Sequence, residues 1–331
     1  MTRSQGNRRA GGRQERLARR EAKPEIDPCP PGQRGGQYRP LSISDMEDIR
    51  DTAFRLLAEL GMGEVPDRLA EGLKAAGAVE DNRGRFLLPQ DLVEEAIAGA
   101  SRRFVLHGRD PQRSIEVGGE RVYFGTGGAA VQTLDLDTGL YRPSTLRDLH
   151  DFTRLQDTLA NVSWFTRCCV ATDVPDNFDL DVNTAYALLK NTSKPVATSF
   201  TLAEHIPPIV EMFDIAAGGK GSFAKRPFVK AHISPVISPL RFGEDAVDVV
   251  FECIAHDIPI SCITAAQSGA TAPATLAGFL AQSLAETLAS LVMVHAIRPG
   301  FPMVFSNWPF VIDLRTGAFA GGGGEIAVLN A

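Results

Sequence analysis

This sequence lacks most of the signals that mark membrane, secreted and nucleotide-binding proteins. No uncharged apolar run reaches the length of a membrane span, since the most hydrophobic predicted helix, Leu276 to Ile297, contains Glu286 and His295 and is expected to be buried in the protein. The N-terminus has no apolar segment like that of a signal peptide. No GxGxxG motif follows an early strand, so a dinucleotide-binding sheet has no support.

The sequence also has few cysteines and only a small net charge. Five cysteines, an odd number in 331 residues, form no disulfide framework and suit a reducing, cytoplasmic location. Cys168, Cys169 and Cys262 would be the best thiolate set, but adjacent strand residues point to opposite faces, and free Cys is commonly a small core residue. We therefore predict no metal site. The net charge of −6 gives no reason to expect nucleic acid as a partner, and no membrane contact is expected.

With 44% apolar residues, the chain can bury one large domain that carries an appendage. Thr2 to Lys23 contains eight Lys and Arg residues among Gly, Gln and Asn, so residues 1–37 are predicted to form a basic, disordered tail and linker. A contact between this tail and an acidic partner is the alternative. Residues 38–124 are predicted to form a helical cap with a small hairpin, and residues 125–331 a barrel.

The cap is predicted from helix start and stop signals. Ser44 and Glu47 fit a capping box, and Gly61 ends the helix that follows. Two more helices are expected over Pro66 to Ala76 and Pro89 to Ala100, each with Pro near its start. Short strands are predicted at Phe104–His107, Ser114–Val117 and Arg121–Phe124, with Gly118-Gly119 as the hairpin signal between the last two.

The rest of the chain repeats a strand, a loop and a helix. Phe228 to Gly269 shows the unit best, with short β-branched runs on either side of helix-spaced Val247, Val250 and Ile254. Similar strands begin near Ala129, Val162, Pro195, Phe228, Ile258 and Pro302, at a spacing of roughly 33 residues for most steps. The second is expected to run from Val162 to Val170, with Asp173 after its end, the fifth from Ile258 to Thr264 and the last from Met303 to Asn307.

Evenly spaced units without a dinucleotide fingerprint favour an α/β fold of the (β/α)8 TIM-barrel type over an open sheet. The first unit would be the strand Ala129 to Leu134, a turn at Asp137 to Gly139 and a helix from Thr145 to Leu159. Only about six units are present, and the chain stops in an apparent helix at Ala331. We therefore expect a truncated barrel from a longer protein.

In a barrel, chemistry lies where the strands end. Three polar residues at predicted strand ends, His232, Gln267 and Asn307, are candidate catalytic residues. Aromatic residues near the same ends suit a protonated or quaternary amine, which aromatic faces attract. The candidate substrate-binding residues are Trp164, Phe200, Glu204, Trp308 and Phe310.

Two further features leave alternatives open. Lys230 lies within a predicted strand and could form a Schiff base in a lyase, or could be a satisfied interior charge. The run Gly321 to Gly324, followed by Glu325 and a helix, could cradle an anion or could be a flexible turn. It is no Walker loop, because no Lys and Ser or Thr follow it.

Four blocks in the same order resemble the trimethylamine:corrinoid methyltransferase family. They are GGQYRPLS (Gly35 to Ser42), FGTGGAAVQTLDLDTGLYRPSTLRDLHDFTRLQDTL (Phe124 to Leu159), ISPVISPLRF (Ile233 to Phe242) and GAFAGGGGEIAVLNA (Gly317 to Ala331). Gly322, Gly323, Gly324 and Glu325 match the last block, and the resemblance makes the glycines candidate cofactor-binding residues and Glu325 a candidate catalytic residue.

The resemblance implies a barrel that moves a methyl group from a methylated amine to the Co(I) corrinoid of a separate carrier protein. The cobalamin-type cofactor would be presented by that partner and not bound tightly by this chain. Some members carry pyrrolysine, as in methanogenesis from trimethylamine, and others resemble enzymes for quaternary amines such as glycine betaine. The pyrrolysine position falls beyond Ala331. A homo-oligomer is expected. A catalytically silent fragment and a lyase acting through Lys230 are the alternatives.

Overall fold

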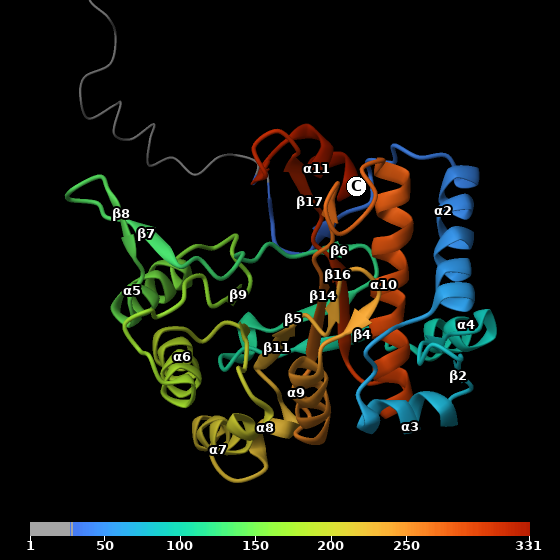
Figure 1. The fold of residues 1–331 in the computed structure, drawn as a ribbon. Coiled ribbons are helices and arrows are strands. Elements are labelled where there is room, and N and C mark those ends of the chain that lie inside the picture. Colours follow the sequence, from blue (N-terminus) through green and yellow to red (C-terminus); the bar gives the residue numbers. More distant parts are fainter. Residues whose placement is uncertain (1–26, 28) are drawn as a thin grey trace, which may run out of the picture. The chain divides into compact units, whose positions relative to one another are not determined.

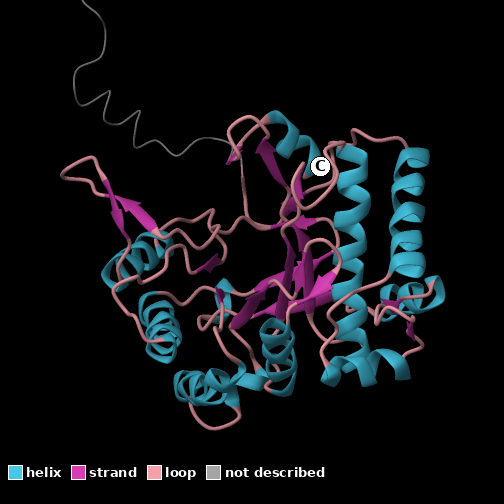
Figure 2. Ribbon diagram, viewed as in Figure 1, coloured by secondary structure: helices cyan, strands magenta, loops and turns pink. Residues whose placement is uncertain are grey.

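The computed structural model describes Asp27 and residues 29–331. The predicted basic stretch from Thr2 to Lys23 lies outside these residues. Every helix and strand below belongs to one compact unit, Pro31–Ala331. This unit mixes helices with a parallel sheet, so the predicted α/β class is confirmed (Figure 2).

A five-stranded parallel sheet forms the centre of the unit (Figure 1). Each strand lies beside the one that precedes it in the sequence, because each is a short apolar run followed by a helical crossover. The order ends at the first and last of these strands, so the hydrogen-bonded sheet is not closed within the described residues. The strands are β9 (Phe165–Thr166), β10 (Val196–Thr198), β11 (Val229–Ile233), β14 (Ile260–Thr264) and β16 (Met303–Asn307).

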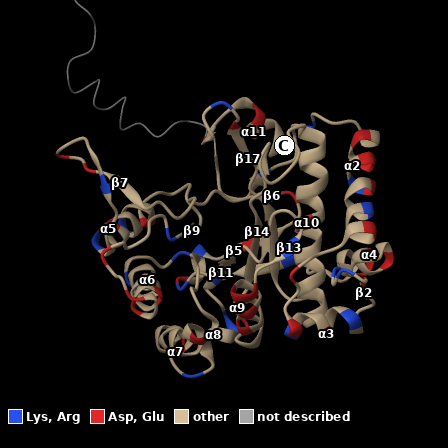
Figure 3. Cartoon of the chain, viewed as in Figure 1, with Lys and Arg blue, Asp and Glu red and all other residues tan. Residues whose placement is uncertain are grey.

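The crossover helices are α6 (Asn177–Asn191), α7 (Ile206–Ala217) with α8 (Ser222–Lys225), α9 (Glu244–Ala255) and α10 (Leu276–Ile297). The longest, α10, packs against β14 and β16 on one side and against α2, α3 and α4 on the other. It is the one helix of the described chain that is long and apolar enough to cross a membrane, and 72% of its most apolar window is buried inside the protein. Its prediction as a buried helix is therefore confirmed, and Figure 3 shows it nearly free of charged residues.

The N-terminal layer consists of α2 (Ile43–Arg55), a π-helical turn at Leu56–Leu60, α3 (Asp67–Ala75) and α4 (Gln90–Gly99), with the strand pair β2 (Val79–Glu80) and β3 (Phe86–Leu87). The predicted capping box was wrong by two residues, because Ser42 caps α2 and exchanges hydrogen bonds with Asp45. Gly61 ends the turn with φ +66°, and a Cβ there would lie 2.3 Å from the carbonyl oxygen of Phe86.

The first predicted barrel unit was wrong in its strand. β7 (Gln132–Leu134) pairs antiparallel with β8 (Tyr141–Pro143) across the Asp137-Thr138-Gly139 turn, so it is one arm of a hairpin. The preceding segment takes the place beside β9, since Gly125 and Ala130 form parallel bridges to Trp164 and Cys169. The helix of this unit is α5 (Leu146–Asp157), which begins at a capping box between Thr145 and Asp148.

The predicted Gly118-Gly119 hairpin was also wrong. β4 (Arg103–Leu106) and β5 (Ile115–Gly118) form the hairpin, joined by a 3₁₀ turn at Pro111–Arg113. β6 (Arg121–Val122) instead pairs with β1 (Gln33–Arg34). Gly118 has φ +126°, and a Cβ there would lie 2.3 Å from the carbonyl of Arg102, so its glycine allows close strand approach.

The remaining elements follow the carboxyl ends of the main strands. They are the pair β12 (Val236–Ile237) and β13 (Arg241–Phe242), the 3₁₀ turn η3 (Ala203–His205), the small sheet of β15 (Gln267–Ser268), β17 (Phe310–Asp313) and β18 (Ala318–Phe319), and α11 (Gly324–Leu329).

Candidate functional site

A pocket of about 170 Å³ lies at the carboxyl ends of the parallel strands. This is the edge of a parallel sheet where binding sites gather, because the loops after the strands meet there. Each main strand or the loop that follows it contributes a residue, and the segment beside β9 adds two. The lining residues are Gly128, Ala129, Thr166, Arg167, Ser199, His232, Ser234, Ile263 and Trp308.

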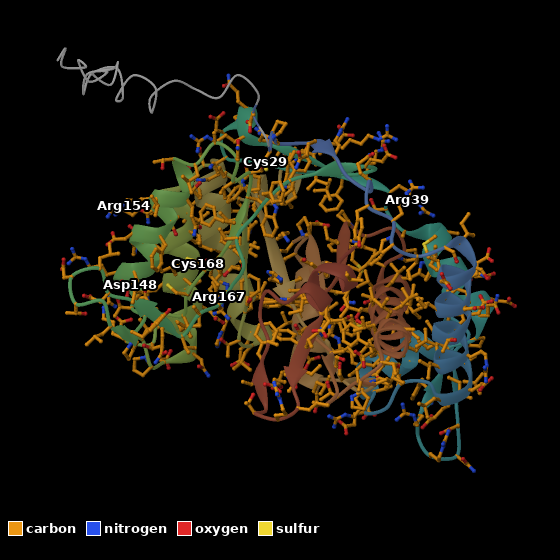
Figure 4. All side chains as sticks on the ribbon, turned by 90° about the horizontal axis from the view of Figure 1, so that it is seen from above. Cys29, Arg39, Asp148, Arg154, Arg167 and Cys168 are labelled. Carbon is orange, nitrogen blue, oxygen red and sulfur yellow. The ribbon has the colours of Figure 1, made fainter. Side chains whose placement is uncertain are left out.

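Arg167, directly after β9, is the only charged residue that lines this pocket. Its Nε atom is buried and has no hydrogen-bond partner, and no described residue forms an ion pair with its guanidinium. Burial lowers the pKa of Arg167, although the group stays charged at neutral pH because arginine starts from so high a value. In Figure 4, Arg167 lies nearer the sheet than Arg154, which projects from α5. The pocket therefore holds an unpaired positive charge.

Asp181 on α6 is the carboxylate whose charge raises the pKa of Arg167. Its oxygens are already occupied. Oδ2 accepts from the backbone N–H of Thr201 at 2.6 Å and contacts Nδ1 of His205 at 2.8 Å, while Oδ1 accepts from the Thr201 hydroxyl at 2.9 Å. Because Asp181 is held by these partners, it does not pair with Arg167, and the guanidinium is left for a ligand.

His232 on β11 supplies a neutral imidazole. Burial, followed by the positive charges of Lys230 and Arg167, lowers the pKa of His232 to about 4. The ring is therefore uncharged at neutral pH and offers one donor and one acceptor nitrogen. The hydroxyls of Ser199 and Ser234 add neutral polar groups to the same pocket, so no side chain in it can act as a strong acid at neutral pH.

Trp308 provides the aromatic wall. Trp308 is 43% exposed, and its ring is tilted by 41° against that of Phe310, with centroids 4.9 Å apart, while the rings of Phe310 and Phe319 have centroids 4.7 Å apart. This row of rings fixes the indole at the pocket mouth. An indole face attracts a quaternary or protonated amine. The pocket therefore combines a group that attracts an anion with one that attracts a cation.

The structure brings together only some of the predicted site residues. His232 and Trp308 line the pocket. Trp164 lies deeper, at the amino side of the sheet, beside Lys230. Phe200 is 8% exposed and belongs to the hydrophobic core, and Glu204 is exposed in the 3₁₀ turn η3.

The other predicted residues lie outside the pocket lining. Asn307 on β16 is paired with Thr264 on β14, so the two side chains point to the same face of the sheet. The Thr264 hydroxyl accepts a hydrogen bond from Thr287 of α10, so this is the face that the helices cover. The Oδ1 of Asn307 is buried without a partner. Gln267 is exposed on β15 and pairs with Phe310 on β17. Gly322, Gly323, Gly324 and Glu325 lie at the start of α11, which packs against α10 and β17.

The sequence prediction missed Arg167. The stretch from Val162 to Val170 was predicted as one strand, so the first charged residue after it, Asp173, was considered in place of Arg167. A single charged residue within a stretch that has no other charge was the signal that could have found it. No three His, Cys, Asp or Glu side chains among the described residues are placed to hold a metal ion, and Cys29, Cys168, Cys169, Cys253 and Cys262 are free thiols.

Comparison with known proteins gives one family. Residues 9–331 match the family model described as trimethylamine methyltransferase (MTTB). The chain is 28% identical over 292 residues to a trimethylamine methyltransferase of Desulfitobacterium hafniense, covering 88% of this chain and 58% of the relative. It is 26% identical over 298 residues to a glycine betaine methyltransferase of the same species (90% and 61%), and 24% identical over 302 residues to trimethylamine methyltransferase MttB1 of Methanosarcina mazei (90% and 61%). The chain thus spans about three fifths of these relatives.

Proposed function

Because this chain belongs to the trimethylamine methyltransferase family, we propose that it transfers a methyl group from a methylated amine to a corrinoid on a separate carrier protein. The corrinoid would supply the nucleophile, its reduced cobalt. This chain would bind the amine, direct one methyl group toward the pocket mouth and exclude water from the reacting atoms. Gly128, Ala129 and the exposed Ser234 contribute only small groups to the lining, which leaves room beside Trp308 for the approach of a large acceptor.

We propose that the substrate is a quaternary amine with a carboxylate, of which glycine betaine is the simplest example. The observation that carries this choice is the unpaired guanidinium of Arg167 in the same pocket as the exposed face of Trp308. A carboxylate would pair with Arg167, and the trimethylammonium end would lie against the indole. Trimethylamine has no carboxylate, so it would leave the buried charge of Arg167 uncompensated and would be repelled by it when protonated.

The bond-breaking step favours the same substrate class. When a methyl group leaves a quaternary ammonium, the electron pair of the broken C–N bond stays on nitrogen and the product is a neutral tertiary amine. No proton is needed. A tertiary amine is a comparable leaving group only with a proton on its nitrogen. Trimethylamine already carries that proton in neutral water, so it would enter the pocket as a cation without a carboxylate, next to the charged Arg167.

We also propose that the sheet is part of a (β/α)8 barrel in a cytoplasmic protein. Strands that lie in sequence order, with no reversal of that order, are typical of a barrel, whereas an open doubly wound sheet reverses direction at a switch point. The segment from Gly125 to Ala130, parallel to β9, extends this order by one position.

Binding and turnover test these proposals separately. Titration calorimetry on the 331-residue chain is expected to show the highest affinity for glycine betaine. Choline, which has the ammonium without the carboxylate, should bind more weakly, and trimethylamine more weakly still. Chemically reduced cobalamin or a reduced carrier protein serves as acceptor, and mass spectrometry follows dimethylglycine. Tighter binding of trimethylamine than of glycine betaine would refute the substrate class. Binding without dimethylglycine formation would instead support a catalytically silent chain.

A further inference from the structure

A second cavity, of about 200 Å³, lies at the amino half of the sheet and shares no lining residue with the pocket above. The hairpin of β4 and β5 covers it from one side, and the early residues of β11 and β16 form the other. Its walls are mainly apolar. The lining residues are Leu106, Ile115, Val117, Gly118, Arg121, Tyr123, Trp164, Lys230 and Val304.

Lys230 is the chemically distinctive residue of this cavity. Lys230 is 5% exposed, and its Nζ lies 4.2 Å from the centroid of the Trp164 ring. Within the described residues this amine has no hydrogen-bond acceptor and no carboxylate partner. Glu116, an acidic residue on the covering hairpin, is paired with Arg103 and Arg121.

Lys194 shows what a structural buried lysine looks like in the same protein. It is 8% exposed, and its Nζ donates to the carbonyl oxygens of Gln156 at 2.9 Å and Leu159 at 2.7 Å. A buried ammonium normally requires such acceptors, since transferring an uncompensated charge out of water is strongly unfavourable. Lys230 lacks them and faces open space, so packing alone does not account for it.

We propose that Lys230 is the nucleophile of a second site, where it binds a small aldehyde or ketone as an iminium. The amine nitrogen adds to the carbonyl carbon, and the carbonyl oxygen leaves as water with two protons, so that a C=N bond replaces C=O. The iminium keeps one positive charge above Trp164, where the lysine ammonium already lies. The apolar walls accept the hydrocarbon part of the ligand. The volume of about 200 Å³ is below the usual range of pockets for drug-sized ligands, so it suits a small carbonyl compound.

The amine is also in a reactive state. Burial lowers the pKa of Lys230 to about 8. At pH 7.5 about a quarter of it is neutral, against about 0.1% of an exposed lysine of pKa near 10.4. The other ionisable groups around it are His232 on the same strand and Arg121 and Tyr123 in the cavity wall. None of these is a carboxylate that would restore the charged form.

Reductive trapping on the intact chain tests the proposal. The protein is incubated at pH 7.5 with limiting acetaldehyde or pyruvate and cyanoborohydride, and modified lysines are located by peptide mass mapping. The expected result is one label per chain, with Lys230 labelled about tenfold or more above Lys194 and the exposed Lys220. Labelling of Lys230 should rise with pH around a midpoint near 8. Label confined to exposed lysines, with both probes, would overturn the proposal.

Two variants complete the test. Lys230→Met is expected to remove the dominant label, and Lys194→Met is expected to keep it. If pyruvate only shields Lys230 from other reagents and leaves no reduced adduct, the cavity binds carboxylates and the proposal is wrong. The assay contains neither corrinoid nor methylated amine, so its outcome is independent of the methyl-transfer proposal.

Discussion

Replacing Arg167 by Met tests the substrate proposal most directly, because the two side chains have similar length and only Arg carries charge. Removing one partner of a buried charge pair weakens binding by about 2–4 kcal/mol. At about 1.4 kcal/mol per factor of ten, the Kd for glycine betaine should rise roughly 30- to 700-fold. Binding of trimethylamine should be unchanged or tighter, since a positive charge leaves the pocket.

The same substitution should stabilise the free protein. Arg167 has a buried Nε without a partner, and no carboxylate bonds to its guanidinium within the described chain. Replacing an uncompensated buried charge by an apolar side chain is expected to raise the free energy of unfolding by about 1–2 kcal/mol. A variant that binds less ligand yet melts at a higher temperature cannot be explained by misfolding.

Calorimetric titration and thermal melting measure the two effects, with Arg154→Met as the control. Arg154 is exposed on α5 and pairs with Asp151 at the surface, so its loss should change neither quantity noticeably. Equal weakening of glycine betaine and trimethylamine in Arg167→Met would refute the reasoning, because the guanidinium would then not distinguish a carboxylate. A lower melting temperature would show that Arg167 is a structural residue.

Three further changes address other parts of the protein. Trp308→Leu should weaken glycine betaine binding by about 1–2 kcal/mol, measured by calorimetry, because the ammonium loses the indole face. Lys230→Met should be more stable than wild type by on the order of 3 kcal/mol below pH 8, and this difference should shrink as the pH rises from about 8 toward 10.4, where the wild-type amine loses its charge in both states. Urea unfolding across this range measures it. Asp181→Asn should lower the free energy of unfolding by about 2–4 kcal/mol in the same assay, because the Asp181 carboxylate accepts a hydrogen bond from Thr201 and contacts His205 in the protein interior.

Each of these has its own control. Phe319→Leu, at the far end of the aromatic row, should affect binding less than Trp308→Leu. If the difference in unfolding free energy between Lys230→Met and wild type stays constant between pH 7 and pH 10.5, the substitution does not remove a buried charge. Asp179→Asn, at an exposed site in the first turn of α6, should change stability by less than about 0.5 kcal/mol. A similar loss of unfolding free energy in both Asp variants would show that the buried contacts of Asp181 do not stabilise the protein.

The strands of the parallel sheet were the most predictable part of the fold. The run Met303 to Asn307 was predicted as a strand and is β16, and Ile258 to Thr264 contains β14. β14 is buried along its whole length and appears in the sequence as a run rich in β-branched residues, which is typical of a strand covered on both faces. The crossover helices were predictable for a similar reason, since helix-spaced apolar residues must face the sheet.

The local signals that failed were ambiguous in themselves. Both Ser42-x-x-Asp45 and Ser44-x-x-Glu47 fit a capping box, and only the path of the chain decides which serine precedes the helix. The Asp137-Thr138-Gly139 turn fits a loop between a strand and a helix as well as it fits the β7–β8 hairpin. Neither choice can be made without knowing the neighbouring segments.

The pocket was predictable only in part, because its prediction depended on where each strand ends. His232 and Trp308 were found, since the ends of β11 and β16 were placed well. β9 was placed too long and ends at Thr166, which makes Arg167 the residue at the edge. Asp173 instead accepts the backbone N–H of Leu146 at 2.8 Å, near the start of α5. An error of four residues at one strand end therefore hid the only charge in the pocket.

The position of α10 has a consequence for how this protein is made. The helix is covered by α2, α3 and α4, which leave the ribosome more than 170 residues earlier, as the interval from Gly99 at the end of α4 to Leu276 shows. The apolar faces of the early helices that pack against α10 therefore stay uncovered during synthesis until α10 is made. If the early helices were deleted, a 22-residue segment of bilayer-spanning length would lose its cover. Such a chain is expected to aggregate or to associate with membranes. By burying α10, the N-terminal layer would therefore also prevent this helix from inserting into a membrane.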